Sequence, residues 1–161
     1  MISRVLAAAA LAAAAAQPPA VTAIDSDGLT RVIRESGARV LVVNMWATWC
    51  APCREEFPDL VKFHKEFEGR GVGVVSVSMD LPSDLESKVI PFLRDQKAGF
   101  PSYIKTPGGD EAFINAIDET WSGGLPATFI YDASGRLVKS IHGTTSHDSL
   151  AELVRPMLSQ D

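Results

Sequence analysis

The sequence predicts a single α/β domain in which a mixed central sheet is flanked by helices on both faces. Three observations lead to this prediction. Strand, helix and strand patterns follow one another over residues 39–77, as in a parallel βαβ unit. Two apolar runs, residues 127–131 and 136–142, are separated by a short Asp/Gly turn, which is typical of an antiparallel hairpin. The length of 161 residues, 46% of them hydrophobic and 22% charged, fits one globular domain.

The first expected element of this domain is a helix over residues 29–36. Acidic residues at positions 25–27 can cap its start, and Gly37 can end it. Residues 39–46 then form an almost continuous apolar run rich in β-branched side chains. Such a run predicts a strand that is buried on both faces, in the middle of the sheet.

A second helix is expected to start at or near Cys50. Pro52 fits its first turn, where the missing N–H group has no helical partner to lose, and Pro58 predicts a kink. Residues 72–77 follow as a second buried strand. The two strands are therefore expected to be parallel, with a right-handed crossover through the helix.

The remainder of the chain is predicted to carry a helical insertion between about residues 80 and 123 and then to return to the sheet. In order, we expect a helix over 85–96 disturbed by Pro91, a short strand over 100–104, a short helix over 109–117, the hairpin described above, and a closing helix over 146–158 capped by Ser146.

The N-terminal residues differ from the rest of the chain. Arg4 is followed by twelve apolar residues, 5–16, and then by a Pro-containing break, which is the pattern of a secretory signal peptide. Twelve residues are too few to span a bilayer, which needs about 20. Cleavage is possible after Ala16 or after Ala23, and we assign residues 1–23 to the signal peptide and residues 24–161 to the domain. The protein is then expected to be periplasmic or otherwise exported, or membrane-tethered if the segment stays uncleaved.

The charge pattern limits the partners of the protein. The formal net charge is −5, and no run of basic residues occurs. Binding to nucleic acid needs a concentrated positive surface, so a nucleic-acid partner is excluded.

The only two cysteines, Cys50 and Cys53, are separated by two residues. A disulfide between them closes a very short loop, which the chain-entropy model values at only about 2 kcal/mol. Two cysteines also fall short of the four ligands of a structural zinc site. Since both structural roles fit poorly, redox chemistry explains the pair better. An exported protein is also in a compartment where disulfides persist.

The position of this pair at the start of a helix suits thiol–disulfide exchange. Unpaired N–H groups and the helix dipole favour an anion there, so the pKa of Cys50 is expected to fall. Cys53 lies three residues further on, on the same helical face. Cys50 can attack a substrate disulfide and Cys53 can resolve the mixed disulfide that forms. No cofactor and no metal is required.

The residues around the pair make the assignment more specific. The segment Trp46-Ala47-Thr48-Trp49-Cys50-Ala51-Pro52-Cys53, followed by Glu56-Phe57-Pro58, resembles the active-site segment of exported thioredoxin-like proteins of the TlpA and ResA type. The similarity extends to Gly124-Leu125-Pro126-Ala127-Thr128 and the strand that follows. The resemblance implies a thioredoxin fold and a role as thiol–disulfide oxidoreductase. It also implies a protein substrate such as apocytochrome c, a membrane redox donor as partner, and action as a monomer.

The same resemblance implies a role for each matching residue. Cys50 matches the exposed nucleophile and Cys53 the resolving thiol. Pro126 matches the cis-proline that faces the disulfide. The residues expected to line the substrate groove are Trp49, Ala51, Pro52 and Leu125, the last through its free backbone.

One departure concerns the proton that the resolving thiol exchanges. General thioredoxins usually carry a buried Asp at the position of Asn44, and Asn cannot take a proton. The TlpA-like group instead has a Glu at the position of Glu56, which shares a helical face with Cys53. We therefore expect Glu56 to be the acid/base partner of Cys53, with a pKa raised by burial.

Two other functions fit the same residues less well. The pair could hold copper in a thioredoxin-fold chaperone without turnover. Peroxiredoxins share the fold, but they have a Thr three residues before the reactive Cys, where this chain has Ala47. Asp80 and Asp84 form another acidic pair, which a loop with a helix cap explains. The direction of electron flow, reductant or oxidant, depends on the reduction potential, and the resemblance favours a reductant.

Overall fold

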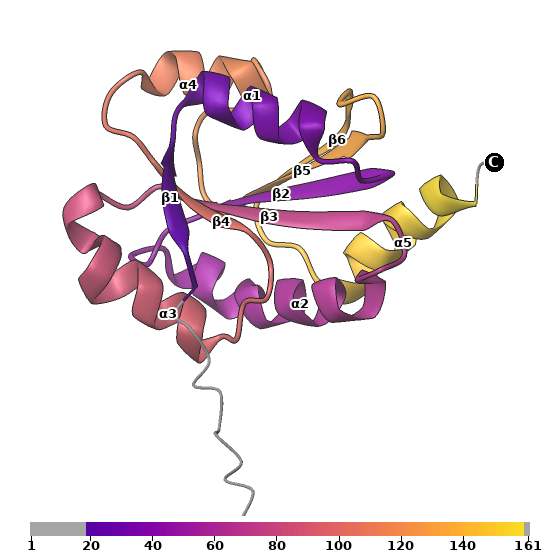
Figure 1. Cartoon of the computed structure of the whole chain (residues 1–161), viewed down its shortest axis with the longest axis horizontal. Helices are drawn as coiled ribbons and strands as arrows, with labels where there is room; N and C mark the ends of the chain where they lie inside the picture. The colour runs from indigo at the N-terminus through magenta and orange to yellow at the C-terminus, as the bar shows by residue number, and fades with distance from the viewer. Residues whose placement is uncertain (1–18, 160–161) are drawn as a thin grey trace, which may run out of the picture.

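The computed structural model describes residues 19–159 and contains a six-stranded mixed sheet between two layers of helices (Figure 1). The strand order is β1-β4-β3-β2-β5-β6. The elements are β1 (Val21–Ile24), α1 (Ser26–Glu35), β2 (Val40–Trp46), α2 (Ala51–Phe67), β3 (Val72–Ser78), the 3₁₀ turn η1 (Pro82–Asp84), the π turn η2 (Leu85–Val89), α3 (Ile90–Asp95), β4 (Ser102–Lys105), α4 (Asp110–Ile117), β5 (Ala127–Asp132), β6 (Leu137–His142) and α5 (His147–Leu158).

Strand β2 lies in the middle of this sheet, and all seven of its residues are buried. It pairs in parallel with β3, from Val40 opposite Val72 to Trp46 opposite Ser78. On its other side it pairs antiparallel with β5. The apolar run therefore forms the expected central strand, and α2 is the expected crossover between two parallel strands.

The two helical layers are visible above and below the sheet in Figure 1. Helices α1 and α4 cover one face, and α2, α3 and α5 cover the other. Alternate residues of β2 point to opposite faces, so each face has its own apolar core. The larger core packs Phe57, Phe63 and Leu150 against the sheet, and the smaller one packs Leu29 and Phe113.

Strand β1 was not expected from the sequence, because the first three of its four residues were assigned to the signal peptide. Val21–Ile24 pairs in parallel with Ser102–Lys105 of β4 and forms one edge of the sheet. The predicted domain start at residue 24 therefore falls inside a strand. Cleavage after Ala16 leaves β1 whole, whereas cleavage after Ala23 removes three of its four residues. The rest of the predicted signal peptide, residues 1–18, lies outside the described residues.

The insertion between residues 80 and 123 contains more than helices. It supplies strand β4, which pairs with both β3 and β1. The helix expected over residues 85–96 is divided into the π turn η2 and the α-helix α3. Pro91 lies at this transition and has no N–H group for a regular helical bond, which accounts for the irregular turn. Across residues 19–159, no helix has the length and apolar character needed to cross a membrane.

Candidate active site

Cys50 and Cys53 form a disulfide at the N-terminus of helix α2, with an S–S distance of 2.10 Å. Strand β2 ends at Trp46, and a tight turn follows in which the N–H of Cys50 donates to the carbonyl of Ala47 at 3.2 Å. Cys50 is the N-cap of the helix, and its Sγ accepts a hydrogen bond of 3.3 Å from the N–H of Cys53. An N–H group is thus already aimed at the sulfur that would carry negative charge in the reduced protein.

The two sulfurs differ in accessibility. Cys53 is fully buried, whereas Cys50 retains 6% of its surface. Ala51 and Pro52, which separate them, are exposed, and Pro52 occupies the first turn of the helix as expected. Cys50, which has exposed neighbours on both sides, is therefore the cysteine nearer to the surface.

Trp49 directly precedes Cys50, and the Leu125–Pro126 segment directly precedes β5, which pairs with β2. The Leu125–Pro126 peptide bond is cis, as the resemblance implies, and Pro126 is buried directly before β5. The side chain of Trp49 is 68% exposed. It lines two clefts: one of about 320 Å³ shared with Leu125 and Leu81, and one of about 380 Å³ shared with Thr48 and Arg54. Trp49, the residue directly before Cys50, thus contributes to the wall of both clefts.

Glu56 is buried on α2, three residues after Cys53. Its Oε2 accepts a hydrogen bond of 2.8 Å from the N–H of Thr145, in the loop between β6 and α5. Burial raises the pKa of Glu56, and the hydrogen bonds from Thr145 and Asn44 oppose that rise without cancelling it. A carboxyl group with this environment can exchange a proton nearer to neutral pH than an ordinary Glu.

Asn44 of β2 holds the other oxygen of this carboxyl group. Its Nδ2 donates 3.0 Å hydrogen bonds to Oε1 of Glu56 and to Oγ1 of Thr128. Asn44 is itself buried, and its Oδ1 has no partner within the described residues. The site therefore contains a buried amide and a buried carboxyl group side by side, and only Glu56 can ionise.

Asp80 has a role here that the sequence did not reveal. The sequence predicts a loop acid near a helix cap, but η1 begins at Pro82, and its N-cap residue Leu81 makes no side-chain cap bond. Asp80 is instead buried, and its carboxylate accepts hydrogen bonds from both the N–H and the hydroxyl of Thr48, directly before Trp49. The sequence signal for this contact is weak, namely an Asp shortly after a buried strand that ends close to the active site. Thr145, whose N–H binds Glu56, had no sequence signal.

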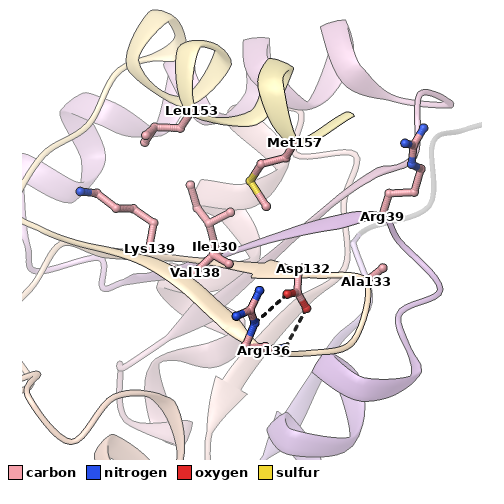
Figure 2. A pocket seen from close by; sticks show the side chains of 9 residues that line it. All are labelled: Arg39, Ile130, Asp132, Ala133, Arg136, Val138, Lys139, Leu153 and Met157. Carbon is pink, nitrogen blue, oxygen red and sulfur yellow. Dashed lines mark hydrogen bonds and ion pairs between the residues drawn. The ribbon is translucent and has the colours of Figure 1, made fainter. Parts of the chain in front are cut away.

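Another cleft, of about 550 Å³, lies away from these residues (Figure 2). It is bordered by the start of β2, the β5–β6 hairpin and α5. Figure 2 shows Leu153 and Met157 of α5 above Val138 and Lys139 of β6. The cleft borders Arg39, directly before β2, whereas the disulfide follows the other end of this seven-residue strand, so the two are separated by about 20 Å. This cleft is not part of the redox site. Over residues 19–159, no three His, Cys, Asp or Glu side chains gather as a metal site.

Comparison with known proteins places this geometry among redox proteins. The model of the AhpC/TSA family matches residues 14–140. The thiol-disulfide oxidoreductase ResA from Bacillus subtilis is 28% identical over 137 residues, which cover 82% of this chain and 70% of ResA. The thiol:disulfide interchange protein HelX from Rhodobacter capsulatus is 30% identical over 127 residues, which cover 75% of this chain and 62% of HelX.

Solved structures agree with these relatives. A thiol:disulfide interchange protein of the thioredoxin family from Chlorobium tepidum TLS superimposes with a TM-score of 0.66 at 28% identity, over 91% of this chain and all of that one. A thioredoxin-related protein from Neisseria meningitidis serogroup B gives a TM-score of 0.64 at 29% identity, over 76% of this chain and 87% of that one.

Proposed function

The chain belongs to the AhpC/TSA family and is a thiol–disulfide oxidoreductase of the ResA and HelX type, and from this premise we propose that it reduces disulfides of exported proteins through Cys50 and Cys53. The thioredoxin fold expected from the sequence is confirmed by the solved relatives and by the mixed sheet. One observation carries the proposal: Cys50 is the N-cap of α2, between the exposed Trp49 and Ala51, and keeps 6% of its surface, whereas Cys53 in the first turn keeps none.

The proposed reaction begins with the reduced pair. The Cys50 thiolate attacks one sulfur of the substrate disulfide, a mixed disulfide forms, and the first substrate sulfur leaves and takes up a proton. The Cys53 thiol then loses its proton and attacks Sγ of Cys50. This step releases the second substrate thiol and forms the Cys50–Cys53 disulfide seen here. The substrate has gained two electrons and two protons, and a separate thiol reductant restores the pair.

Glu56 is proposed to receive the proton of Cys53. It is three residues beyond Cys53 on α2, and burial raises its pKa. Because Cys53 is fully buried, bulk water is a poor acceptor for its proton. A buried carboxylate that binds Asn44 and Thr145 is a fixed acceptor in this position.

The substrate and the location follow from the same proposal. We place the protein outside the cytosol, as a monomer that meets a membrane thiol donor and a substrate such as apocytochrome c. The haem-attachment motif of an apocytochrome c, Cys-x-x-Cys-His, contains two close cysteines that can form a disulfide. An oxidised peptide with this motif should be reduced faster than a control peptide with the same two cysteines in a different sequence context.

The decisive experiment uses the two single cysteine variants. Cys53→Ser, mixed with an oxidised substrate protein, should accumulate a mixed disulfide that non-reducing electrophoresis detects, whereas Cys50→Ser should trap nothing and lose turnover. A reduction potential well below about −200 mV for the wild-type pair supports a reductant, and one near −120 mV points to an oxidant. Full turnover by Cys50→Ser would overturn the proposal. Stoichiometric Cu(I) binding with negligible exchange would favour the copper chaperone instead.

A further inference from the structure

Asp80 is a buried acid that binds the chain directly before the disulfide. It lies two residues after the end of β3 and is 3% exposed. Its Oδ2 accepts a 2.9 Å hydrogen bond from the N–H of Thr48, and its Oδ1 accepts one of 2.5 Å from the Thr48 hydroxyl. Ser78 donates a third bond, 2.6 Å, to Oδ2. Both carboxylate oxygens are thus directed at one residue of the loop between β2 and α2.

Burial of a carboxyl group costs free energy unless hydrogen bonds compensate for the lost contact with water. Asp80 does not cap the following turn, since Leu81 is the N-cap residue and no side chain bonds there. Nor does it pair with Asp84, whose carboxylate binds Lys88 at 3.0 Å. Both bonds of Asp80 outside its own strand end are made to Thr48. The contact therefore serves the loop that carries Thr48.

The residue that this loop presents is Trp49. Because 68% of its surface is exposed, core packing does not fix the Trp49 side chain, and its position depends on the backbone before it. Trp49 lines two clefts, one together with Asp80, Leu81 and Leu125 and the other together with Thr48, and so forms a wall common to both. A shift of Thr48 would move this wall and change the width of both clefts.

We propose that Asp80 is a positioning residue for protein substrates: by holding Thr48 with both carboxylate oxygens, it fixes Trp49 between the two clefts and so shapes the surface on which a protein disulfide docks against Cys50. This inference rests on the proposed function. It acts on docking rather than on sulfur chemistry, because Asp80 binds Thr48 and not the cysteines. Small disulfides, which need no docking surface, are affected little.

The test compares a protein disulfide with the small disulfide 5,5′-dithiobis(2-nitrobenzoate). Asp80→Ala should raise KM for the protein disulfide about tenfold, while the rate with the small disulfide stays within twofold of the wild type. Asp80→Asn retains one acceptor oxygen, so its KM for the protein disulfide should lie between those of the wild type and Asp80→Ala. The matched control is Ser78→Ala, which removes a bond to the same carboxylate without touching the loop and should leave KM unchanged.

The Thr48 variants give an independent readout if Asp80→Ala fails to fold. Thr48→Val removes the hydroxyl but keeps the shape of the side chain and should raise KM severalfold, whereas Thr48→Ser keeps the hydroxyl and should have the KM of the wild type.

A double-variant cycle tests whether Asp80 acts through Trp49. In a Trp49→Ala background, Asp80→Asn should raise KM no further, and a full additional increase would overturn the inference. Equal KM for Asp80→Ala and Ser78→Ala, in a wild type that turns over normally, would also overturn it. A wild type that reduces neither substrate would contradict the proposed function instead.

Discussion

The side-chain amide of Asn44 donates a 3.0 Å hydrogen bond to Oε1 of Glu56, and this bond joins the central strand β2 to the helix that carries both cysteines. Both residues are buried. Since an amide cannot ionise, the carboxyl group of Glu56 is the one member of the pair that can exchange a proton. In the proposed mechanism, Glu56 is the proton acceptor that Asn44, as an amide, cannot be.

Asn44→Asp should destabilise the oxidised protein at neutral pH. The change places a second carboxyl group within hydrogen-bond distance of Glu56, in a buried site where two negative charges repel. We expect the free energy of unfolding to fall by about 1–3 kcal/mol at pH 7, and by less near pH 4, where one carboxyl group is protonated and can donate to the other. Urea denaturation at both pH values measures the difference. Thr128→Val removes the other acceptor of Asn44 without adding charge, so it should lower the free energy of unfolding by similar amounts at both pH values. Equal costs at both pH values for Asn44→Asp would contradict this account.

The elements around these residues were largely predictable from the sequence. The continuous apolar run of β2 and the Pro and Cys residues at the start of α2 are local signals, and the structure confirms them. The edge strand β1 was missed because it is only four residues long and follows an Ala-rich segment, so that its first three residues were assigned to the signal peptide. An exposed edge strand is specified by its neighbour β4, which lies about 80 residues away in the chain.

The contacts of the site were predictable only in part. Glu56 could be singled out because the resemblance to TlpA-like proteins implies a Glu at its position, and its helical spacing from Cys53 is compatible with that role. The Thr48–Asp80 bond connects residues 32 positions apart, and the Glu56–Thr145 bond connects residues 89 apart. No periodicity encodes such pairs. They arise because the carboxyl ends of β2 and β3 meet at one edge of the sheet, and because the loop after β6 reaches α2.

Glu56→Gln should slow the resolving step of the reaction. Gln cannot accept the proton of Cys53, so we expect release of the mixed disulfide to slow about 10-fold to 100-fold near neutral pH. The first attack by Cys50, which does not use Glu56, should keep its rate. Rapid-quench separation of the mixed disulfide from the products measures the two steps. Glu55→Gln, an exposed change one position earlier on the same helix, is the matched control. If both variants resolve the mixed disulfide at the wild-type rate, Glu56 is not the proton acceptor.

The same substitution should change how stability depends on pH. Burial raises the folded-state pKa of Glu56 above its unfolded value of about 4.3. The stabilisation from the protonated form is complete below the unfolded pKa and is lost as the pH rises through the folded one. Gln stays neutral and has no such loss. The free energy of unfolding of Glu56→Gln, relative to wild type, should therefore increase from pH 4 to pH 8 in urea denaturation of the oxidised protein. A difference that is constant over this range would show that the pKa of Glu56 is the same in both states.

The position of the mature N-terminus can be tested through strand β1. A chain that begins at Gln17 keeps all four residues that pair with β4, whereas one that begins at Ile24 keeps only the last and leaves β4 as the new edge. Loss of the β1 hydrogen bonds should lower the free energy of unfolding by on the order of 2 kcal/mol. Urea denaturation of the two chains measures this cost, and mass spectrometry of the protein recovered from outside the cytosol identifies the natural start. We expect that start at Gln17, because removal of β1 would leave the N–H and C=O groups along one side of β4 unpaired. Equal stability of the two chains, or a natural start at Ile24, would show that β1 is dispensable and that the domain begins at residue 24.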